Sequence, residues 1–452
     1  MNNKKKVIFF LVFILLFNCS FDSKSPISKT IWSGEKEEKK RVAALEKEQL
    51  KEQNKDRIYS SGDIYSTEKI LKNKIILSKS KKNSAWKMSG LNNQNFLGNI
   101  YLSGVNNEFL KKKIGKNKLS LSKVTNPLLI YKNNLFLSDD KGTIFNINEY
   151  GEINWKKNIY KKIYKKIYKN LSLVIHENNI YVADNIGLIY AIDSDSGRLI
   201  WIKNHGVPLK SKIKIFDDKI FLINQDNKVF SLNTKNGSSI WNVHLASSFI
   251  KSQKSLSLAL SSQGDIIACT SSGDLIKMNS INGNISWALN TLGSTIEVTD
   301  FFETSDIVII NESIIFSTQR ETFSYNLNSG TINWKTKVSS ADTPIVDGKN
   351  IFFVTKNGYF VIISLDTGEI ISSTNILAIL KKRKQFTKIT GFIMGSGKIY
   401  SVTLNGYLIV SSPTSGKVEN FIKIGSPITS APIINNGKLF IYTEKSRIFG
   451  FN

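Results

Sequence analysis

The sequence is poor in the residues that build most disulfide, metal and catalytic sites. Its 452 residues include only two cysteines and three histidines. Two cysteines cannot form a disulfide framework, and Cys269, inside an apolar run, is predicted to be a buried small hydrophobe. His176, His205 and His244 lack the spacing of metal ligands, and no HExxH, GxSxG or glycine-rich phosphate loop is present. We therefore expect no metal site, no catalytic site and no enzymatic activity.

Arginine is also scarce, although the chain is strongly basic. Lysine and arginine total 62 against 36 acidic residues, a net charge of +26, yet only six of the basic residues are arginines. A basic surface suggests nucleic acid, lipid or an acidic protein as a partner. Phosphate recognition favours arginine, and asparagine and isoleucine are abundant as well. We therefore interpret the lysine excess as compositional bias and expect no nucleic-acid partner.

The first residues have the layout of a secretory signal. Three lysines precede the apolar run Val7–Phe17, whose eleven residues fall short of the ~20 that span a bilayer but suit a signal peptide. Residues 16–19, Leu-Phe-Asn-Cys, resemble the lipobox of bacterial lipoproteins. We predict a signal peptide over residues 1–18 and a lipidated Cys19, with a plain secretory signal as the alternative. Because Ser20 stands where an inner-membrane retention signal carries aspartate, the expected location is the periplasmic face of the outer membrane.

Residues 19–83 follow as a polar segment. Glu35–Arg57 mixes lysine and glutamate with few apolar residues, so it lacks the apolar area to form a core. We predict a lipidated cysteine followed by a flexible, charged tether. A helix that docks on a partner is the alternative.

From about residue 128 the chain repeats one phrase. Each copy has three apolar strands separated by short polar turns, then a turn glycine. In five copies a tryptophan follows four residues later, whereas two degenerate copies carry Ser372 and Asn420 there. Successive tryptophans are 46, 40, 46 and 47 residues apart. Four short strands and their turns need this length, which is typical of one β-propeller blade. The repeat tryptophans are Trp155, Trp201, Trp241, Trp287 and Trp334.

The number of copies predicts the number of blades. Seven complete copies carry the turn glycine, and residues 431–452 supply only three further strands. Ser84–Ser89, which contains Trp86, is predicted to supply the missing strand. The sequence thus predicts an all-β, eight-bladed propeller over residues 84–452, with four-stranded antiparallel blades. An N-terminal strand pairing with the C-terminal strands closes the ring and leaves no free strand edge; an open β-solenoid is the alternative.

The glycines and tryptophans of the repeat are predicted to be structural. Glycine permits a positive φ in a tight hairpin turn. A tryptophan at the same place in consecutive blades is predicted to pack between neighbouring sheets and not to stack on a ligand, and we place Trp86 in this set. The turn glycines are Gly151, Gly197, Gly237, Gly283, Gly330, Gly368 and Gly416.

The phrase IYAIDSDSGRLIW at residues 189–201 resembles the repeat of PQQ-like propellers. With its eight predicted blades, its lipobox and its predicted periplasmic location, the chain resembles the BamB family of outer membrane protein assembly lipoproteins over residues 84–452. The resemblance implies a non-catalytic periplasmic scaffold without a cofactor. It further implies binding to the BamA-like insertase, to other lipoproteins of the assembly machinery and to unfolded outer membrane proteins.

The resemblance also implies where the insertase binds. The family uses two neighbouring loops, after the tryptophan strands of blades three and four, which are Leu245–Leu256 and Leu292–Ile307 here. In the first, Ile250 and Lys251 stand where the family carries leucine and arginine, and lysine lacks the bidentate geometry of arginine.

In the second loop, residues 305–307, Ser-Asp-Ile, match an acidic stretch of the family, whereas Val308 stands at its second acidic position. The alternative interpretation is that both are ordinary surface loops whose residues have no binding role. The partner-binding residues implied by the resemblance are Ile250, Lys251, Glu303 and Asp306.

Two other functions stay open. PQQ-dependent quinoprotein oxidoreductases resemble this fold, but they carry an adjacent cysteine pair and an aspartate base with calcium ligands, and Cys269 is the one cysteine of the propeller region. A propeller that binds an envelope polymer is the second alternative. The run Ile159–Lys169 repeats a four-residue basic and aromatic unit, which we interpret as an inserted loop; contact with phosphorylated lipid is its alternative.

Overall fold

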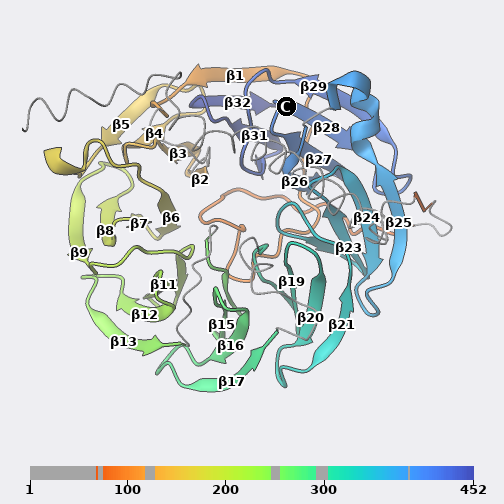
Figure 1. Cartoon of the computed structure of the whole chain (residues 1–452). Coiled ribbons are helices and arrows are strands. Elements are labelled where there is room, and N and C mark those ends of the chain that lie inside the picture. The colour runs from red at the N-terminus through yellow and green to blue at the C-terminus, as the bar shows by residue number, and fades with distance from the viewer. Residues whose placement is uncertain (1–67, 70–74, 118–127, 246–254, 292–303, 385–386) are drawn as a thin grey trace, which may run out of the picture. The chain divides into compact units, whose positions relative to one another are not determined.

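The described residues form a β-propeller. The computed structural model describes residues 68–69, 75–117, 128–245, 255–291, 304–384 and 387–452. Its strands form eight four-stranded antiparallel sheets arranged around a common axis (Figure 1). Residues 63–452 make up one compact unit. The predicted all-β fold with eight blades is confirmed, whereas the predicted signal peptide and Cys19 lie outside the described residues.

Each blade runs from an inner strand beside the axis to an outer strand at the rim. Blades 1 to 4 comprise β2 (Leu129–Tyr131), β3 (Asn134–Ser138), β4 (Ile144–Ile147) and β5 (Ile153–Lys157); β6 (Leu171–His176), β7 (Asn179–Asp184), β8 (Leu188–Asp193) and β9 (Leu199–Asn204); β10 (Lys214–Phe216), β11 (Lys219–Ile223), β12 (Lys228–Asn233) and β13 (Ser239–His244); and β14 (Leu258–Leu260), β15 (Ile266–Cys269), β16 (Asp274–Met278) and β17 (Ile285–Asn290). Blades 5 to 8 comprise β18 (Val308–Ile310), β19 (Ser313–Ser317), β20 (Thr322–Asn326) and β21 (Ile332–Thr336); β22 (Ile345–Asp347), β23 (Asn350–Val354), β24 (Tyr359–Ser364) and β25 (Ile370–Asn375); β26 (Ile389–Gly395), β27 (Lys398–Thr403), β28 (Tyr407–Ser411) and β29 (Val418–Lys423); and β30 (Ile433–Asn435), β31 (Lys438–Tyr442), β32 (Arg447–Phe451) and β1 (Glu108–Lys113).

Short helical turns lie in two of the connections between blades. The 3-10 helix η2 (Lys162–Tyr164) joins blades 1 and 2, and η4 (Ile376–Lys384) joins blades 6 and 7. Within the described ranges, no helix has the length and apolar character needed to span a bilayer.

The burial of the strands explains the hydrophobic pattern of the repeat. In blade 3, β11 and β12 are buried at nearly every position, whereas the outer strand β13 alternates between exposed and half-buried side chains. Strands covered by a sheet on both faces are expected to be almost continuously apolar, and a strand at the rim is expected to be half polar.

Each repeat tryptophan packs against the turn of the next blade. The indole Nε1 of Trp201 donates a hydrogen bond to the carbonyl of Thr234 at 2.9 Å. A Cβ atom at Gly237, whose φ is +68°, would lie 2.6 Å from the same indole. The turn glycine therefore meets two requirements, a left-handed backbone and the close approach of the indole. The other pairs are Trp155 with Ser194, Trp241 with Ser280, Trp287 with Leu327 and Trp334 with Leu365.

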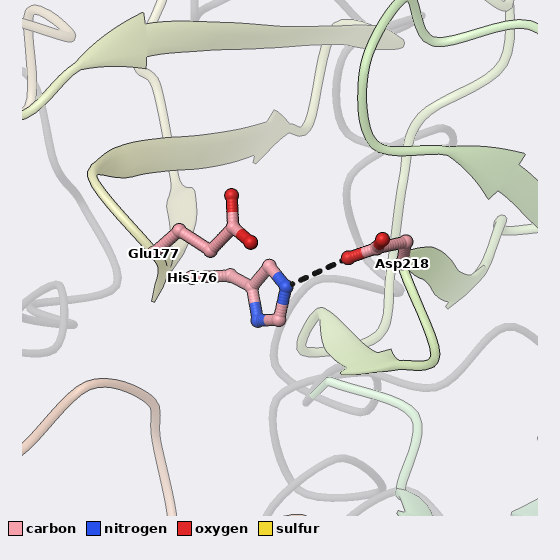
Figure 2. Close-up of side chains that lie close together, drawn as sticks. All are labelled: His176, Glu177 and Asp218. Atoms are coloured by element: carbon pink, nitrogen blue, oxygen red, sulfur yellow. Dashed lines mark hydrogen bonds and ion pairs between the residues drawn. The ribbon is translucent and has the colours of Figure 1, made fainter.

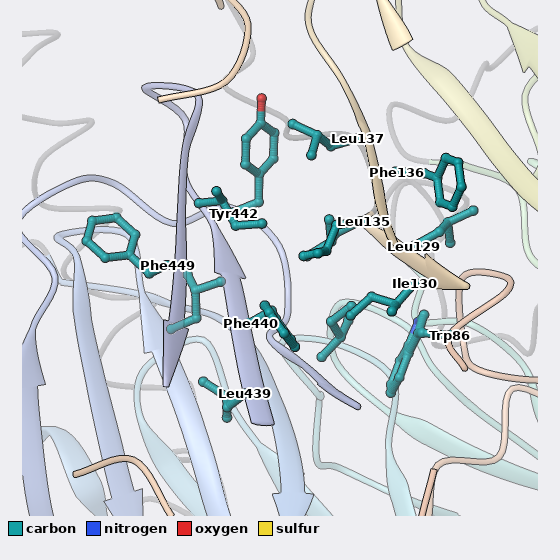
Figure 3. Close-up of a cluster of buried hydrophobic side chains, with 14 of the residues drawn as sticks. Trp86, Leu129, Ile130, Leu135, Phe136, Leu137, Leu439, Phe440, Tyr442 and Phe449 are labelled. Carbon is teal, nitrogen blue, oxygen red and sulfur yellow. The ribbon is translucent and has the colours of Figure 1, made fainter. Parts of the chain in front are cut away.

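The strand that closes the ring is not the predicted one. β1 pairs antiparallel with β32 and completes blade 8, so closure by an N-terminal strand is confirmed but its assignment to Ser84–Ser89 is wrong. Trp86 pairs through its backbone with Ile130 of the inner strand β2 and is buried beside side chains of blades 1 and 8 (Figure 3). β1 contains no tryptophan; Leu110 and Lys112 lie against Gly151 instead. A search for tryptophan could not find this strand.

Residues 75–83, which we assigned to the tether, pack on the propeller. Ile75 is buried in a cluster with side chains of blades 6 and 7. The backbone N–H of Ser78 donates to Asp347 Oδ2 at 2.8 Å. The folded unit therefore begins before residue 84. The many lysines around this stretch made it look polar, although a few of its apolar side chains are buried.

Candidate functional site

The chain's own N-terminal segment, residues 75–107, occupies the middle of the ring (Figure 1). The inner strand of each blade is an edge strand, and an unpaired edge leaves N–H and C=O groups without partners. Hydrogen bonds join this segment to every blade. For blades 1 to 8 in order they are Trp86 N to Ile130 O, Ile175 N to Lys87 O, Asn93 Nδ2 to Ile215 O, Leu260 N to Asn93 O, Ile309 N to Gln94 O, Ser78 N to Asp347 Oδ2, Ile100 N to Met394 O and Ser103 N to Gly437 O.

A buried lysine anchors this segment. Lys214, at the start of β10, is fully buried. Its ammonium donates to Asn95 Oδ1 at 2.6 Å, to the carbonyl of Asn92 at 2.7 Å and to the carbonyl of Ser89 at 3.3 Å. Burial lowers the pKa of Lys214 to about 7, because the charged form loses its hydration. Asn95 in turn donates to the carbonyl of Ile307 at 2.7 Å, so Lys214 and Asn95 together link the segment to blades 3 and 5.

A cavity of about 320 Å³ lies at the end of the axis where the inner strands begin. Residues from blades 2 to 8 line it, and Ser89 of the N-terminal segment lines it as well. Serine and threonine hydroxyls predominate in its wall. The charged side chains are Lys210, Lys212, Asp306 and Asp342.

An ion pair between blades 3 and 5 lies at this cavity. Lys212 Nζ is 2.5 Å from Asp306 Oδ2, and the two side chains are 30% and 12% exposed. Burial would raise the pKa of Asp306, but Lys212, Lys214 and a hydrogen bond from Thr343 hold it below its ordinary value. Burial would likewise lower the pKa of Lys212, yet Asp306 and Asp342 raise it. Both groups are therefore charged at neutral pH.

The partner-binding residues implied by the sequence are not brought together in the described structure. Ile250, Lys251 and Glu303 lie outside the described residues. Asp306 is described, and its carboxylate faces the axial cavity and Lys212. Its role in partner binding stays a prediction. Sequence reasoning missed Lys212 and Lys214; the signal was the alternation of lysine and isoleucine over residues 212–215, where a strand buried on both faces begins.

A surface cluster between blades 2 and 3 has donor types that can hold a metal ion (Figure 2). His176 at the end of β6, Glu177 after it, and Asp218 between β10 and β11 offer donor atoms within 4.8 Å of one another. A histidine nitrogen with carboxylate oxygens is a donor set that zinc accepts. However, His176 Nε2 is already 3.1 Å from Asp218 Oδ1. We therefore interpret the cluster as a polar link between neighbouring blades.

Comparison with known proteins decides the family. The family described as outer membrane protein assembly factor BamB matches residues 140–374, just over half of the chain. The chain belongs to the BamB family. No curated protein matches this BamB-family sequence significantly.

Solved structures share the fold of this BamB-family chain at low sequence identity. The crystal structure of BamB from Moraxella catarrhalis has a TM-score of 0.61 and 11% identity, and the match covers 76% of this chain and 99% of that one. Quinohemoprotein alcohol dehydrogenase ADHIIG from Pseudomonas putida HK5 has a TM-score of 0.60 and 7% identity, with 82% and 80% covered. The corresponding enzyme from Comamonas testosteroni has a TM-score of 0.59 and 9% identity, with 82% and 81% covered. At these identities the likeness shows the fold alone.

The described residues do not fit the quinone site implied by the enzyme neighbours. An adjacent cysteine pair cannot exist, because the sequence has only Cys19 and Cys269. Cys269 is buried in β15 among apolar side chains of blades 4 and 5, and burial raises its pKa to about 12. The N-terminal segment also fills the axis with peptide backbone. A shared fold does not by itself carry an activity.

Proposed function

We infer that this chain is a non-catalytic scaffold of the outer membrane protein assembly machinery. It is anchored by a lipid on Cys19 at the periplasmic face of the outer membrane. It binds the BamA-like insertase, works beside the other assembly lipoproteins and assists the insertion of unfolded outer membrane proteins. The observation that carries the proposal is the match of residues 140–374 to the BamB family.

The structure supports a role in which rigidity matters. The ring is closed by β1 on β32, and the N-terminal segment ties all eight blades together at the axis. A rigid ring fixes the spacing between the blades that carry the binding loops, which reduces the conformational entropy that the ring itself loses on binding. The chain's own residues 75–107 occupy the middle of the ring, so we assign binding to the loops, with Leu245–Leu256 and Leu292–Ile307 as the contact surface.

Crosslinking in living cells tests the assignment. A photo-reactive amino acid at residue 250 is expected to capture the insertase, which mass spectrometry of the purified adduct identifies. The matched control is residue 281 in the turn between β16 and β17, an isoleucine that is 68% exposed. The proposed function is wrong if residue 250 captures no assembly component, and the loop assignment is wrong if both positions capture the insertase equally.

Charge reversal separates the loop from the general surface charge. Lys251→Glu is expected to weaken recovery of the insertase in a pull-down, because it places a negative charge where the family carries arginine. Lys235→Glu, at an exposed lysine in the blade 3 turn, makes the same change in net charge and should leave recovery unchanged. Asp306 is unsuited to this test, since its ion pair with Lys212 supports the fold.

A quinoprotein oxidoreductase is the second candidate, because two of the structural neighbours are quinohemoprotein alcohol dehydrogenases. The purified chain, incubated with the quinone, calcium and a dye acceptor, is expected to show no alcohol-dependent reduction of the dye. Reduction that needs both the quinone and the alcohol would establish the enzyme instead.

A further inference from the structure

The connection between β5 and β6 concentrates positive charge. We define the basic loop as residues 156–169, which contain seven lysines and no aspartate or glutamate. Five of these lysines are exposed, namely Lys156, Lys161, Lys162, Lys165 and Lys166. The loop therefore presents a one-sign surface, and its electrostatic field attracts anions.

Two isoleucines of the basic loop are exposed among these lysines. Ile163 is 74% exposed and Ile167 is 45% exposed. Most other exposed isoleucines follow the repeat on outer strands, as in Ile153, Ile200, Ile240, Ile285 and Ile332. Ile163 and Ile167 stand outside the repeat, so neither the fold nor its periodicity requires them to be apolar.

Contacts made by Tyr160, Tyr168 and Lys169 join the basic loop to the propeller. Tyr160 donates from its hydroxyl to Asp184 Oδ2 at 2.6 Å. The buried Lys169 places its Nζ 5.0 Å from the centroid of the Tyr160 ring. Asn185 Nδ2 donates to the carbonyl of Tyr168 at 3.1 Å. Tyr160 therefore faces the propeller, whereas Ile163, Ile167 and the two lysine pairs between Lys161 and Lys166 are exposed to solvent.

We propose that the basic loop is a contact site for an anionic phospholipid surface. Lysines attract the negative surface of such a bilayer, and apolar side chains beside them enter the boundary between headgroups and acyl chains. Nucleic acid would use the lysines for its phosphates but has no use for exposed isoleucines at the same place. The contact does not rest on the scaffold function, and it would orient the ring on the membrane to which a lipid on Cys19 attaches it.

Sedimentation with lipid vesicles tests the proposal. The protein is the chain from residue 20 onward, which keeps the compact unit of residues 63–452 but lacks the predicted signal peptide and lipid. Vesicles contain either phosphatidylcholine alone or phosphatidylcholine with phosphatidylglycerol. We expect binding to the anionic vesicles only.

Two loop variants and two matched controls locate the contact. The first loop variant changes Lys161, Lys162, Lys165 and Lys166 to Gln, and the second is Ile163→Ser with Ile167→Ser. The matched lysine control changes the exposed Lys203, Lys235, Lys335 and Lys337 to Gln, and the isoleucine control is Ile281→Ser. All the changed side chains are exposed, so circular dichroism should report unaltered folding for each variant.

We expect each loop variant to bind the anionic vesicles more weakly by a factor of at least about ten, while both controls stay within about twofold of the unchanged chain. Equal losses in the two lysine variants would overturn the proposal, because net charge alone would then explain binding. Unchanged binding of the isoleucine variant would also overturn it, and would identify a general polyanion site. The proposal would likewise be overturned if all variants bound vesicles of phosphatidylcholine alone, because binding would then not depend on anionic lipid.

Discussion

Replacing Asp306 by alanine should lower the free energy of unfolding of the propeller, because Asp306 forms an ion pair with Lys212 at the axis. The change leaves the ammonium of Lys212 without the carboxylate that lies 2.5 Å away. It also removes from Lys214 a negative charge that favours its protonated form. Removing one partner of a buried pair costs about 3–5 kcal/mol. The Lys212 side chain is 30% exposed, so water screens part of this loss, and we expect a decrease of about 2–3 kcal/mol in the free energy of unfolding.

Equilibrium unfolding in guanidinium, followed by tryptophan fluorescence, measures this decrease. Asp195→Ala is the matched control, because Asp195 and Lys132 form an exposed pair at 3.4 Å with side chains 57% and 46% exposed; such a pair contributes less than about 1 kcal/mol. A combined Lys212→Met and Asp306→Leu variant should recover most of the loss, since no charge is left unpaired. If Asp306→Ala unfolds like Asp195→Ala, the axial ion pair does not stabilise the ring and our reasoning is wrong.

Three further outcomes follow from individual contacts. Gly237→Ala should destabilise the protein by more than about 1 kcal/mol, because its Cβ would lie 2.6 Å from the Trp201 indole. The control is Gly425→Ala, at φ +76° in open space, which should cost only the backbone strain. Equal losses of the free energy of unfolding in the two variants would contradict the packing role of Gly237. The free energy of unfolding should rise between about pH 7 and pH 10.5, because burial lowers the pKa of folded Lys214 and the unfolded chain then binds a proton that the folded chain has released. Lys214→Met should flatten this slope. An unchanged slope would contradict the lowered pKa of Lys214. Cys269, buried and with its pKa raised, should react with iodoacetamide at pH 8 only after denaturation; rapid labelling of the folded chain would show that β15 is accessible.

The repeat could be predicted from the sequence because its information is local. The turn glycine and the tryptophan four residues later lie in one hairpin, and the stacking of identical units then brings each indole against the next glycine, as Trp201 and Gly237 illustrate. A period of about 46 residues in the sequence predicts the blade, and the number of copies predicts the ring. Only the partial last copy required a strand from elsewhere, and its existence was predicted even though its position was not.

The candidate sites were harder to predict because they join residues that are distant in the chain. Lys212 and Asp306 are far apart in sequence and meet only because two connections between blades end at one axis. The sequence resemblance implied that Asp306 binds a partner, and it did not indicate that the carboxylate faces the axial cavity and Lys212. The alternation of lysine and isoleucine marks the start of a strand here, but it does not show that Lys214 is buried, because a segment from another part of the chain covers it.

The amino-acid sequence by itself determined the strands, their turns and the number of blades, because hydrophobic period, glycine position and indole packing act between neighbours along the chain. Only the tertiary structure decided which N-terminal residues close the ring and which fill its axis. Those choices depend on edge strands that become available once eight sheets surround a common centre. β1 and residues 75–107 pair with these edges mostly through backbone hydrogen bonds, which leave little trace in the side-chain pattern.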